Sequence, residues 1–344
     1  MAGVRYDAFR LTKADGKGTW WEGLDPQELY TGPNMVVPDG VASIEAMNAW
    51  HAANDGRWME YGPPRGPFVA KWLARQKDLV EKYRPDLVYF DDSGLPFGSA
   101  GLDAAAHYYN SAVDWRGQAD VVLTAKKLLP VQRRGIVEDV ERGFAEDIMP
   151  EPWQTCTCIG SWHYDRPLYE RRGYKSAKSV VQRLCDIVSK NGNLLLSIPQ
   201  RGDGSIDDQE ESILGDIANW MRTNGAAIYD TRPWRIFGEG PTKIDAGIMN
   251  EGGAKPFTPA DIRFTRSGDA VNAFFLERPR GEARIVSLGA RAMTEATIGK
   301  VELLGHGPVK WRQTSAALVV DMPDSAGFLP CLRIAGDGLV RRIE

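Results

Sequence analysis

The stretch YRPDLVYFDDSG, residues 83–94, decides the fold of this chain. Its apolar and aromatic run 87–90 predicts a strand buried on both faces, and two carboxylates, Asp91 and Asp92, follow at the strand's exit. Upstream, apolar side chains recur at three- and four-residue steps over 68–83, which predicts an amphipathic helix. A helix, a buried strand and an acid at the strand's carboxyl end are how α/β barrels present catalytic groups. The alternative is that both carboxylates only cap the next turn.

Further strands and helices alternate after this stretch, which predicts parallel strands with helices outside them. We expect strands at 121–124, 136–141 and 194–198, and helices around 107–110, 180–188 and 210–222. Beyond residue 235 the pattern changes to short alternating runs between turns, at 262–265, 270–276, 283–288, 301–304 and 317–320. The sequence therefore predicts an α/β fold, with a partial (β/α) TIM-like barrel over 1–235 and an antiparallel β-sandwich over 236–344.

The composition of the chain limits the classes of molecule that we expect it to bind. The net charge is −4, and a protein that binds a phosphate backbone needs a basic surface, so nucleic acid is not expected as a partner. The chain has no apolar run near the roughly 20 residues of a membrane span, so no membrane is expected either. The first residues lack the apolar core of a signal peptide, which favours the cytoplasm by default.

The four cysteines and two of the tryptophans are expected to be buried. The four cysteines have no second Cys or His cluster at ligand spacing, so we expect buried free thiols and no metal. Trp72 and Trp220 occur in helical patterns and are expected in the core. Trp153 and Trp162 occur in loop-like sequence beside polar residues. A sugar contact and a place in the core are both open for these two side chains.

Several motifs resemble those of the retaining α-L-fucosidases of glycoside hydrolase family 29. The run Y-x-P-D-L-x-x-x-D ending at Asp91 resembles the family's nucleophile strand. The segment PWQTCTCIGSWHY, 152–164, resembles the family motif W-E-T-x-x-x-I-G-x-S-W-G-Y. Resemblance extends from about residue 3 to 235 and includes the segments 18–30, 186–204 and 228–234. The remainder fits the family only as an all-β appendage.

The resemblance implies hydrolysis of terminal fucose from glycoconjugates through a covalent intermediate on Asp91, with transfer to other acceptors as a further activity. Such hydrolysis uses two carboxylates roughly 5 Å apart and needs no cofactor, and a fucosylated glycan is the implied substrate. The residues that this resemblance assigns to substrate binding are Trp21, Asp92, Trp153, Gln154, Trp162, His163 and Tyr164.

The acid/base residue is less evident, because Gln154 stands where the family motif has a Glu, and an amide cannot exchange a proton. Glu141 is our first candidate, because it lies nearest the carboxyl end of its predicted strand, and Glu151 is the second. Glu138 would face the opposite side of that strand. The alternative for Glu141 is a structural ion pair with Arg142 or a neighbouring Arg.

The number of strands is a problem for a closed barrel. Only about four or five buried strands precede the sandwich, whereas a TIM barrel has eight, and the family's early strands have no counterpart here. A half barrel exposes unpaired strand edges, so we expect a homo-oligomer or a complementing N-terminal half chain. The alternative function is a catalytically weak or inactive carbohydrate-binding protein derived from this fold, or one chain of a split barrel.

Overall fold

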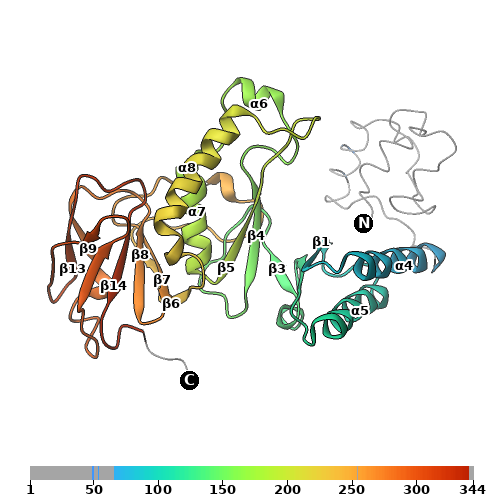
Figure 1. Ribbon diagram of the computed structural model, residues 1–344, viewed down its shortest axis with the longest axis horizontal. Helices are drawn as coiled ribbons and strands as arrows, with labels where there is room; N and C mark the ends of the chain where they lie inside the picture. The colour runs from blue at the N-terminus through green and yellow to red at the C-terminus, as the bar shows by residue number, and fades with distance from the viewer. Residues whose placement is uncertain (1–48, 50–52, 54–65, 254, 341–344) are drawn as a thin grey trace. The chain divides into compact units, whose positions relative to one another are not determined.

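The computed structural model describes residues 49, 53, 66–253 and 255–340 (Figure 1). The chain divides into two compact units, Met1–Glu138 and Asp139–Glu344, which are treated separately below. Within the described residues, no helix is long and apolar enough to cross a membrane.

The first unit alternates helices and strands. Its elements are α4 (Gly66–Tyr83), β1 (Leu87–Ser93), α5 (Ser99–Arg116), β2 (Val122–Lys126), the short 3-10 helix η2 (Gln132–Arg134) and β3 (Val137–Asp139), which ends at the boundary. β1 pairs in parallel with β2, and β2 with β3. Figure 1 shows α4 and α5 side by side, and the two helices are in contact. The predicted helices and strands of this region are confirmed, although β3 is shorter than expected.

The helices α4 and α5 pack on one face of β1, and residues 88–90 of this strand are partly buried. Val88 and Phe90 point toward the helices, where the Phe90 ring lies 6.2 Å from that of the buried Trp72 of α4. Alternation sends the side chains between them to the opposite face, and Leu87, at the strand's start, is 47% exposed. The prediction of a strand buried on both faces is therefore wrong, because the described helices cover only one side of β1.

The second unit continues the parallel pattern. Its first elements are β4 (Trp153–Cys158), α6 (Arg166–Glu170), α7 (Ala177–Ser189), β5 (Gly192–Ser197), α8 (Asp208–Asn224) and the 3-10 helix η3 (Gly225–Ala227). β4 and β5 pair in parallel from Trp153↔Gly192 to Cys158↔Ser197. α7 contacts both β5 and α8, as Figure 1 shows. Asp207 begins α8 with a capping box, in which its side chain accepts from the Glu210 amide.

The rest of this unit is a β-sandwich. Its strands are β6 (Arg232–Glu239), β7 (Ile262–Ser267), β8 (Ala270–Phe275), β9 (Gly281–Ile285), β10 (Lys300–Leu303), β11 (Gly307–Pro308), β12 (Trp311–Gln313), β13 (Leu318–Met322) and β14 (Cys331–Ala335). One sheet has the order β11-β10-β14-β8-β7-β6 and the other β12-β13-β9. Phe264, Ile285, Leu318 and Ile334 belong to the core shared by both sheets.

Two differences from the sequence expectation concern strands. Residues 286–288 form the 3-10 helix η5 (Val286–Leu288) rather than the end of a strand. β4, β6, β11 and β12 were not predicted, whereas β14 agrees with the strand-like pattern around Cys331, and the 3-10 helix η4 (Glu251–Gly253) lies in the connection after β6. The predicted fold class, a partial (β/α) barrel followed by a β-sandwich, is confirmed, with five parallel strands in the part of the chain that the structure describes. The limits 1–235 and 236–344 stay predictions.

Buried groups follow the sequence expectation closely. All four cysteines are buried free thiols, as predicted. Trp72 and Trp220 lie in the core, also as predicted, and the Trp220 indole Nε1 donates to the Leu329 carbonyl at 3.0 Å. This bond joins α8 to the segment that precedes β14.

The long connection between β6 and β7 is held by one buried carboxylate, Asp261. Its two oxygens accept from the amides of Thr242 (2.8 Å) and Thr258 (2.7 Å) and from both threonine hydroxyls. Gly240 lies against it with φ +129°, and a Cβ there would come within 2.4 Å of Asp261 Oδ1. Burial tends to raise the pKa of Asp261, but the four hydrogen bonds outweigh it and hold the pKa below its usual value.

We expect Asp261→Asn to destabilise the protein at pH 7 by about 2 kcal/mol and to reduce its sensitivity to acid. Because the folded pKa is depressed, the carboxylate stabilises the fold above the unfolded pKa of about 3.9, and this stabilisation is lost as pH falls through the folded pKa. Urea unfolding at pH 7 and pH 3 measures both effects. Asp269→Asn, at an exposed turn of the same sandwich, is the control. An equal pH dependence in wild type and Asp261→Asn would contradict this account.

Candidate active site

Asp91 lies at the carboxyl end of β1, on the face that the helices leave open. The Tyr89 hydroxyl donates to Asp91 Oδ1 at 3.4 Å, since residues two apart on a strand share a face. The ammonium of Lys126, the last residue of β2, forms an ion pair with the same oxygen. The Asp91 side chain is 70% exposed, so a ligand can reach its carboxylate.

The neighbours of Asp91 come from the parallel register of β1 and β2. Tyr89 pairs with Thr124 and Ser93 with Lys126, with an irregularity of register between Phe90 and Ser93. The Lys126 ammonium also lies 5.9 Å from the centre of the Tyr89 ring. The sequence analysis missed Lys126. Its position at the end of the next predicted strand could have identified it, because carboxyl ends of neighbouring parallel strands lie together.

In the second unit, a buried polar group surrounds Asp139 at the end of β3. Gln154 Nε2 donates to Asp139 Oδ1 at 2.9 Å, and Cys156 Sγ donates to Asp139 Oδ2 at 3.0 Å. Both partners alternate onto the same face of β4, and the Asp139 side chain is fully buried. Gln154 therefore orients a carboxylate here. The sequence analysis considered Glu138 and Glu141 and missed the aspartate next to Glu138.

Glu141 follows β3 in a turn where Arg142 adopts φ +46°. The Arg142 amide donates to the Cys156 carbonyl at 2.8 Å, so this turn runs beside the second half of β4. The Arg142 guanidinium pairs with Glu251, Nε to Oε1, at 2.5 Å. Glu141 thus lies half-buried at the carboxyl end of its strand, where barrel enzymes place catalytic groups.

The other predicted acids occupy different places. Glu151 precedes β4 and lies at the amino end of that strand, the opposite end from Cys158. Glu138 is buried and forms an ion pair with Arg133. Glu141 therefore remains the first candidate for the acid/base, and Glu151 remains the second.

An aromatic loop follows β4. Trp162 is 38% exposed, His163 is exposed, and the half-buried Tyr164 ring lies 5.7 Å from the Arg201 guanidinium. Asp165 fixes the loop, because it caps α6 through the Leu168 amide (3.0 Å) and accepts from the Ser161 hydroxyl. The exposed ring of Trp162 can pack on the C–H face of a sugar.

Trp153 cannot act in this way. Its side chain is 1% exposed, it packs with Ala145 and Ile187, and its Nε1 donates to the Lys190 carbonyl at 2.9 Å. Its segment is also the buried strand β4 rather than a loop. The prediction of Trp153 as a sugar contact is corrected to a core residue. Trp21 lies outside the described residues, and the side chain of Asp92, within β1, is not described.

Glu251, which the sequence analysis also missed, collects four partners from distant parts of the second unit. The Thr157 hydroxyl donates to it at 2.6 Å, and Arg142, Lys175 (3.1 Å) and Arg183 (3.2 Å) form ion pairs with it. Burial pushes the pKa of Glu251 upward, but these partners push it further down, so the pKa lies below its usual value. A lowered pKa makes Glu251 a poorer proton donor, so we do not assign the general acid to it.

Two protein-family models match the chain. The model described as Alpha-L-fucosidase matches residues 41–226, and the model described as Alpha-L-fucosidase C-terminal domain matches residues 255–333. The first match covers more than half of the chain and includes Asp91, Glu141 and the aromatic loop after β4.

Relatives and solved structures agree with these matches. The chain is 30% identical to plasma alpha-L-fucosidase of Rattus norvegicus over 76% of this chain and 54% of that protein. It is 28% identical to tissue alpha-L-fucosidase of Homo sapiens over 70% of this chain and 48% of that protein. It thus spans about half the length of the curated relatives it matches.

The fold is similar to that of solved fucosidases. A structure described as alpha-L-fucosidase matches with a TM-score of 0.62 at 22% identity, over 81% of this chain and 60% of the other. The Thermotoga maritima alpha-fucosidase matches with a TM-score of 0.61 at 22% identity, over 82% of this chain and 59% of the other. From the family models and the 30% identical relative, we conclude that this chain belongs to the α-L-fucosidase family.

Proposed function

We propose that this chain carries the nucleophile of a retaining α-L-fucosidase, and that the nucleophile is Asp91. The observation that carries the proposal is the position of Asp91: an accessible carboxylate at the carboxyl end of a parallel strand, on the face opposite α4 and α5, beside Tyr89 and Lys126. Membership of the family supports fucose as the sugar. One of the similar solved structures is the Thermotoga maritima alpha-fucosidase in complex with fucose.

In the first step, Asp91 attacks the anomeric carbon of a terminal α-fucosyl group. A C–O bond forms to the carboxylate, the glycosidic C–O bond breaks, and the acid/base residue gives its proton to the leaving oxygen. Lys126 and Tyr89 hold the attacking carboxylate by an ion pair and a hydrogen bond, which keeps it in position before the sugar arrives.

In the second step, the same acid/base residue takes a proton from water, whose oxygen attacks the anomeric carbon. The ester to Asp91 breaks and fucose leaves with its original configuration. A hydroxyl of another sugar can replace water in this step, which gives transfer of fucose to that acceptor. We assign the proton transfers to Glu141, with Glu151 as the second candidate, because Glu141 lies at the carboxyl end of its strand.

Gln154 favours a second candidate function. In this chain an amide stands where the family motif has a carboxylate, and its side chain is used to orient the buried Asp139. A protein without an efficient acid would retain sugar binding through Trp162, His163 and Tyr164 and turn over only activated fucosides. Calorimetric binding of fucose without turnover of an aryl fucoside would favour this candidate.

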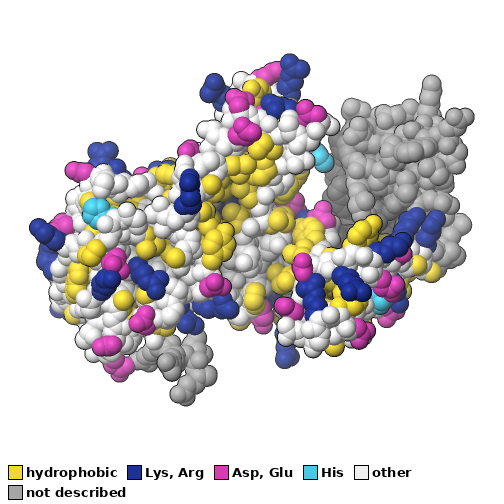
Figure 2. Space-filling model, viewed as in Figure 1, with side chains coloured by type: hydrophobic (Ala, Val, Ile, Leu, Met, Phe, Trp, Pro, Cys, Tyr) yellow, Lys and Arg dark blue, Asp and Glu magenta, His cyan; other side chains and the backbone are white. Residues whose placement is uncertain are grey.

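We also infer that a second copy of this chain covers the open side of the half barrel. Leu195 of β5 is 48% exposed, on the face opposite the helices. On the helix side of the same strand, a hollow of about 600 Å³ is lined by apolar side chains of β5, α7 and α8, including Leu184, Val188, Leu194, Leu196, Ile217 and Met221. Apolar side chains are therefore accessible on both faces of β5, which is the edge strand of its sheet in the described part of the chain. Figure 2 shows hydrophobic side chains gathered near the middle of the view. Exposed apolar surface of this extent is typical of a surface that another chain covers.

Asp91→Ala is expected to lower the turnover of an aryl fucoside by roughly 10⁴-fold or more, because no covalent intermediate can form. Azide should restore part of the activity by displacing the aryl group itself, which gives a fucosyl azide of inverted configuration. Release of the aryl group and NMR of the azide product measure the two effects.

The control for this variant lies on the same strand. Asp86→Ala removes an exposed carboxylate paired with Arg116 at the other end of β1, and turnover should stay within about twofold of wild type. Equal loss in both variants, or full activity in Asp91→Ala, would contradict the assignment.

Glu141→Gln is expected to slow hydrolysis of fucosyl disaccharides by about 10²- to 10⁴-fold, because their leaving oxygen needs a proton. Formation of the intermediate from an aryl fucoside with an acidic phenol should be affected much less. Glu151→Gln is the matched variant and should behave like wild type. If Glu151→Gln shows this substrate dependence and Glu141→Gln does not, the two roles are exchanged.

The purified chain is expected to be oligomeric at micromolar concentration, since association would bury the exposed apolar face. Light scattering coupled to size-exclusion chromatography gives the mass directly. A monodisperse monomer of 38.1 kDa would contradict the proposed assembly.

A further inference from the structure

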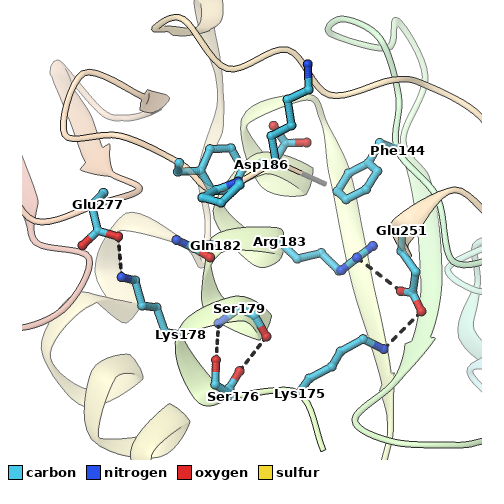
Figure 3. A pocket seen from close by; sticks show the side chains of 13 residues that line it. Phe144, Lys175, Ser176, Lys178, Ser179, Gln182, Arg183, Asp186, Glu251 and Glu277 are labelled. Carbon is cyan, nitrogen blue, oxygen red and sulfur yellow. Dashed lines mark hydrogen bonds and ion pairs between the residues drawn. The ribbon is translucent and has the colours of Figure 1, made fainter. Parts of the chain in front are cut away.

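A cavity of about 480 Å³ lies beside the first turns of α7, within the second unit (Figure 3). It is lined by α7 and Lys175, by Phe144, by Glu251 and residues 255–257, and by Glu277, after β8. Ligand sites commonly fall between about 300 and 1,000 Å³, so the cavity suits a molecule the size of a monosaccharide. None of the residues assigned to fucose hydrolysis above lines it.

Cations outnumber carboxylates around this cavity. Three carboxylates line it, and each already has a cationic partner: Glu251 has three, Glu277 has Lys178, and Asp186 has Lys190 and Arg263. Four cations line the cavity, Lys175, Lys178, Arg183 and Lys255, against these three carboxylates. The surplus favours an anionic ligand.

The start of α7 adds to this positive field. Ser176 caps the 13-residue helix by accepting from the Ser179 amide at 3.2 Å, and the first turn contains no acidic residue. The amides of Ala177 and Lys178 have no partner inside the helix, because the first turn of any helix lacks preceding carbonyls. Such helix ends bind phosphate, sulfate and carboxylate groups.

Arg183, one turn further along α7, points independently to a ligand. Its side chain is 8% exposed, and Figure 3 shows it extending toward Glu251. The guanidinium lies 4.4 Å from the centre of the Phe144 ring, and Nη2 pairs with Glu251. Nη1 is buried and has no hydrogen-bond partner among the described residues. Burial lowers the pKa of Arg183, against the opposing effect of Glu251 and Asp186. An anion in the cavity would offset part of the cost of burying this charge.

We propose that this cavity is a binding site for a tetrahedral oxoanion, a sulfate or phosphate ester, carried on a ligand of monosaccharide size. Lys178, Lys255 and the start of α7 would face the anion, and the buried Arg183 guanidinium adds its positive charge beside them. The partly buried ring of Phe257 and Pro256 line the cavity beside them and offer apolar contact to the sugar. The site is separate from the hydrolytic residues, so it does not depend on the proposed fucosidase activity.

The test is calorimetric titration of the full chain with inorganic sulfate and inorganic phosphate at constant ionic strength, with chloride as the reference anion. We expect saturable binding of one oxoanion per chain. The double variant Lys178→Met/Lys255→Met should weaken it about tenfold or more, as loss of charge-assisted hydrogen bonds does. Lys310→Met, an exposed lysine of the sandwich, is the matched control and should bind like wild type.

Absence of saturable binding in wild type, or equal weakening in the control variant, would overturn the proposal. Galactose 6-sulfate and glucose 6-phosphate, each compared with its neutral sugar, identify the ester. If one of these sugar esters binds more tightly than the corresponding inorganic ion, its ester group, sulfate or phosphate, is the class of ligand that the site binds. If neither does, the proposal of a sugar-sized ligand is wrong. Far-UV circular dichroism of each variant shows that it is folded.

Discussion

The account depends on one constraint, the alternation of side chains along β1. Val88 and Phe90 must pack against α4 and α5, since burial of large apolar groups is the dominant favourable term in folding. Tyr89 and Asp91 are thereby forced onto the other face, away from the helices. The carboxylate is placed in a polar, accessible position as a consequence of packing on the opposite side. A shift of register by one residue would bury Asp91 and expose Phe90, which the packing against Trp72 prevents.

The same alternation organises β4. Trp153 fills the helix side, where Gly192 leaves room for its indole: a Cβ at that glycine would lie 2.5 Å from the ring. Gln154 and Cys156 face the other side and hold Asp139. In β1 this alternation separates an apolar layer under the helices from a polar layer, whereas in β4 the face of Trp153 also carries Thr155 and Thr157, whose hydroxyls are hydrogen-bonded. The polar layers carry the residues to which we assign chemistry, and the apolar layers fix where those residues lie.

Local patterns were sufficient to predict much of the fold. The helical periodicity of 68–83 and the alternating runs after residue 260 report burial directly, and the structure confirms the elements they predicted. The strand β4 was harder, because its Thr and Cys residues are neither strongly apolar nor alternating, although all six residues are buried. The resemblance to a family, rather than any pattern, suggested that this segment contributes to a site.

The missed residues are those whose partners lie far away in sequence. Glu251 forms ion pairs with Arg142, Lys175 and Arg183, which lie 68 to 109 positions earlier in the sequence. No local sequence pattern predicts such a cluster. Asp139 is different from Glu251, because it lies next to Glu138, which was weighed as a candidate acid. Asp186 forms ion pairs with Lys190, four residues away, and with Arg263 of β7. Helical spacing predicts the first of these pairs but not the second. Long-range ion pairs were thus not predicted, whereas packing was predicted in most elements but not for β1 or Trp153.

The most direct measurement is to locate a covalent intermediate. A 2-deoxy-2-fluoro-fucosyl fluoride should react with a retaining enzyme and be hydrolysed slowly, because the fluorine at C2 destabilises the positively charged transition state of both steps. The account predicts one added fluorofucosyl group per active site, located by peptide mass spectrometry on Asp91. A label on another carboxylate, or a protein that turns over aryl fucosides without being labelled at Asp91, would contradict it.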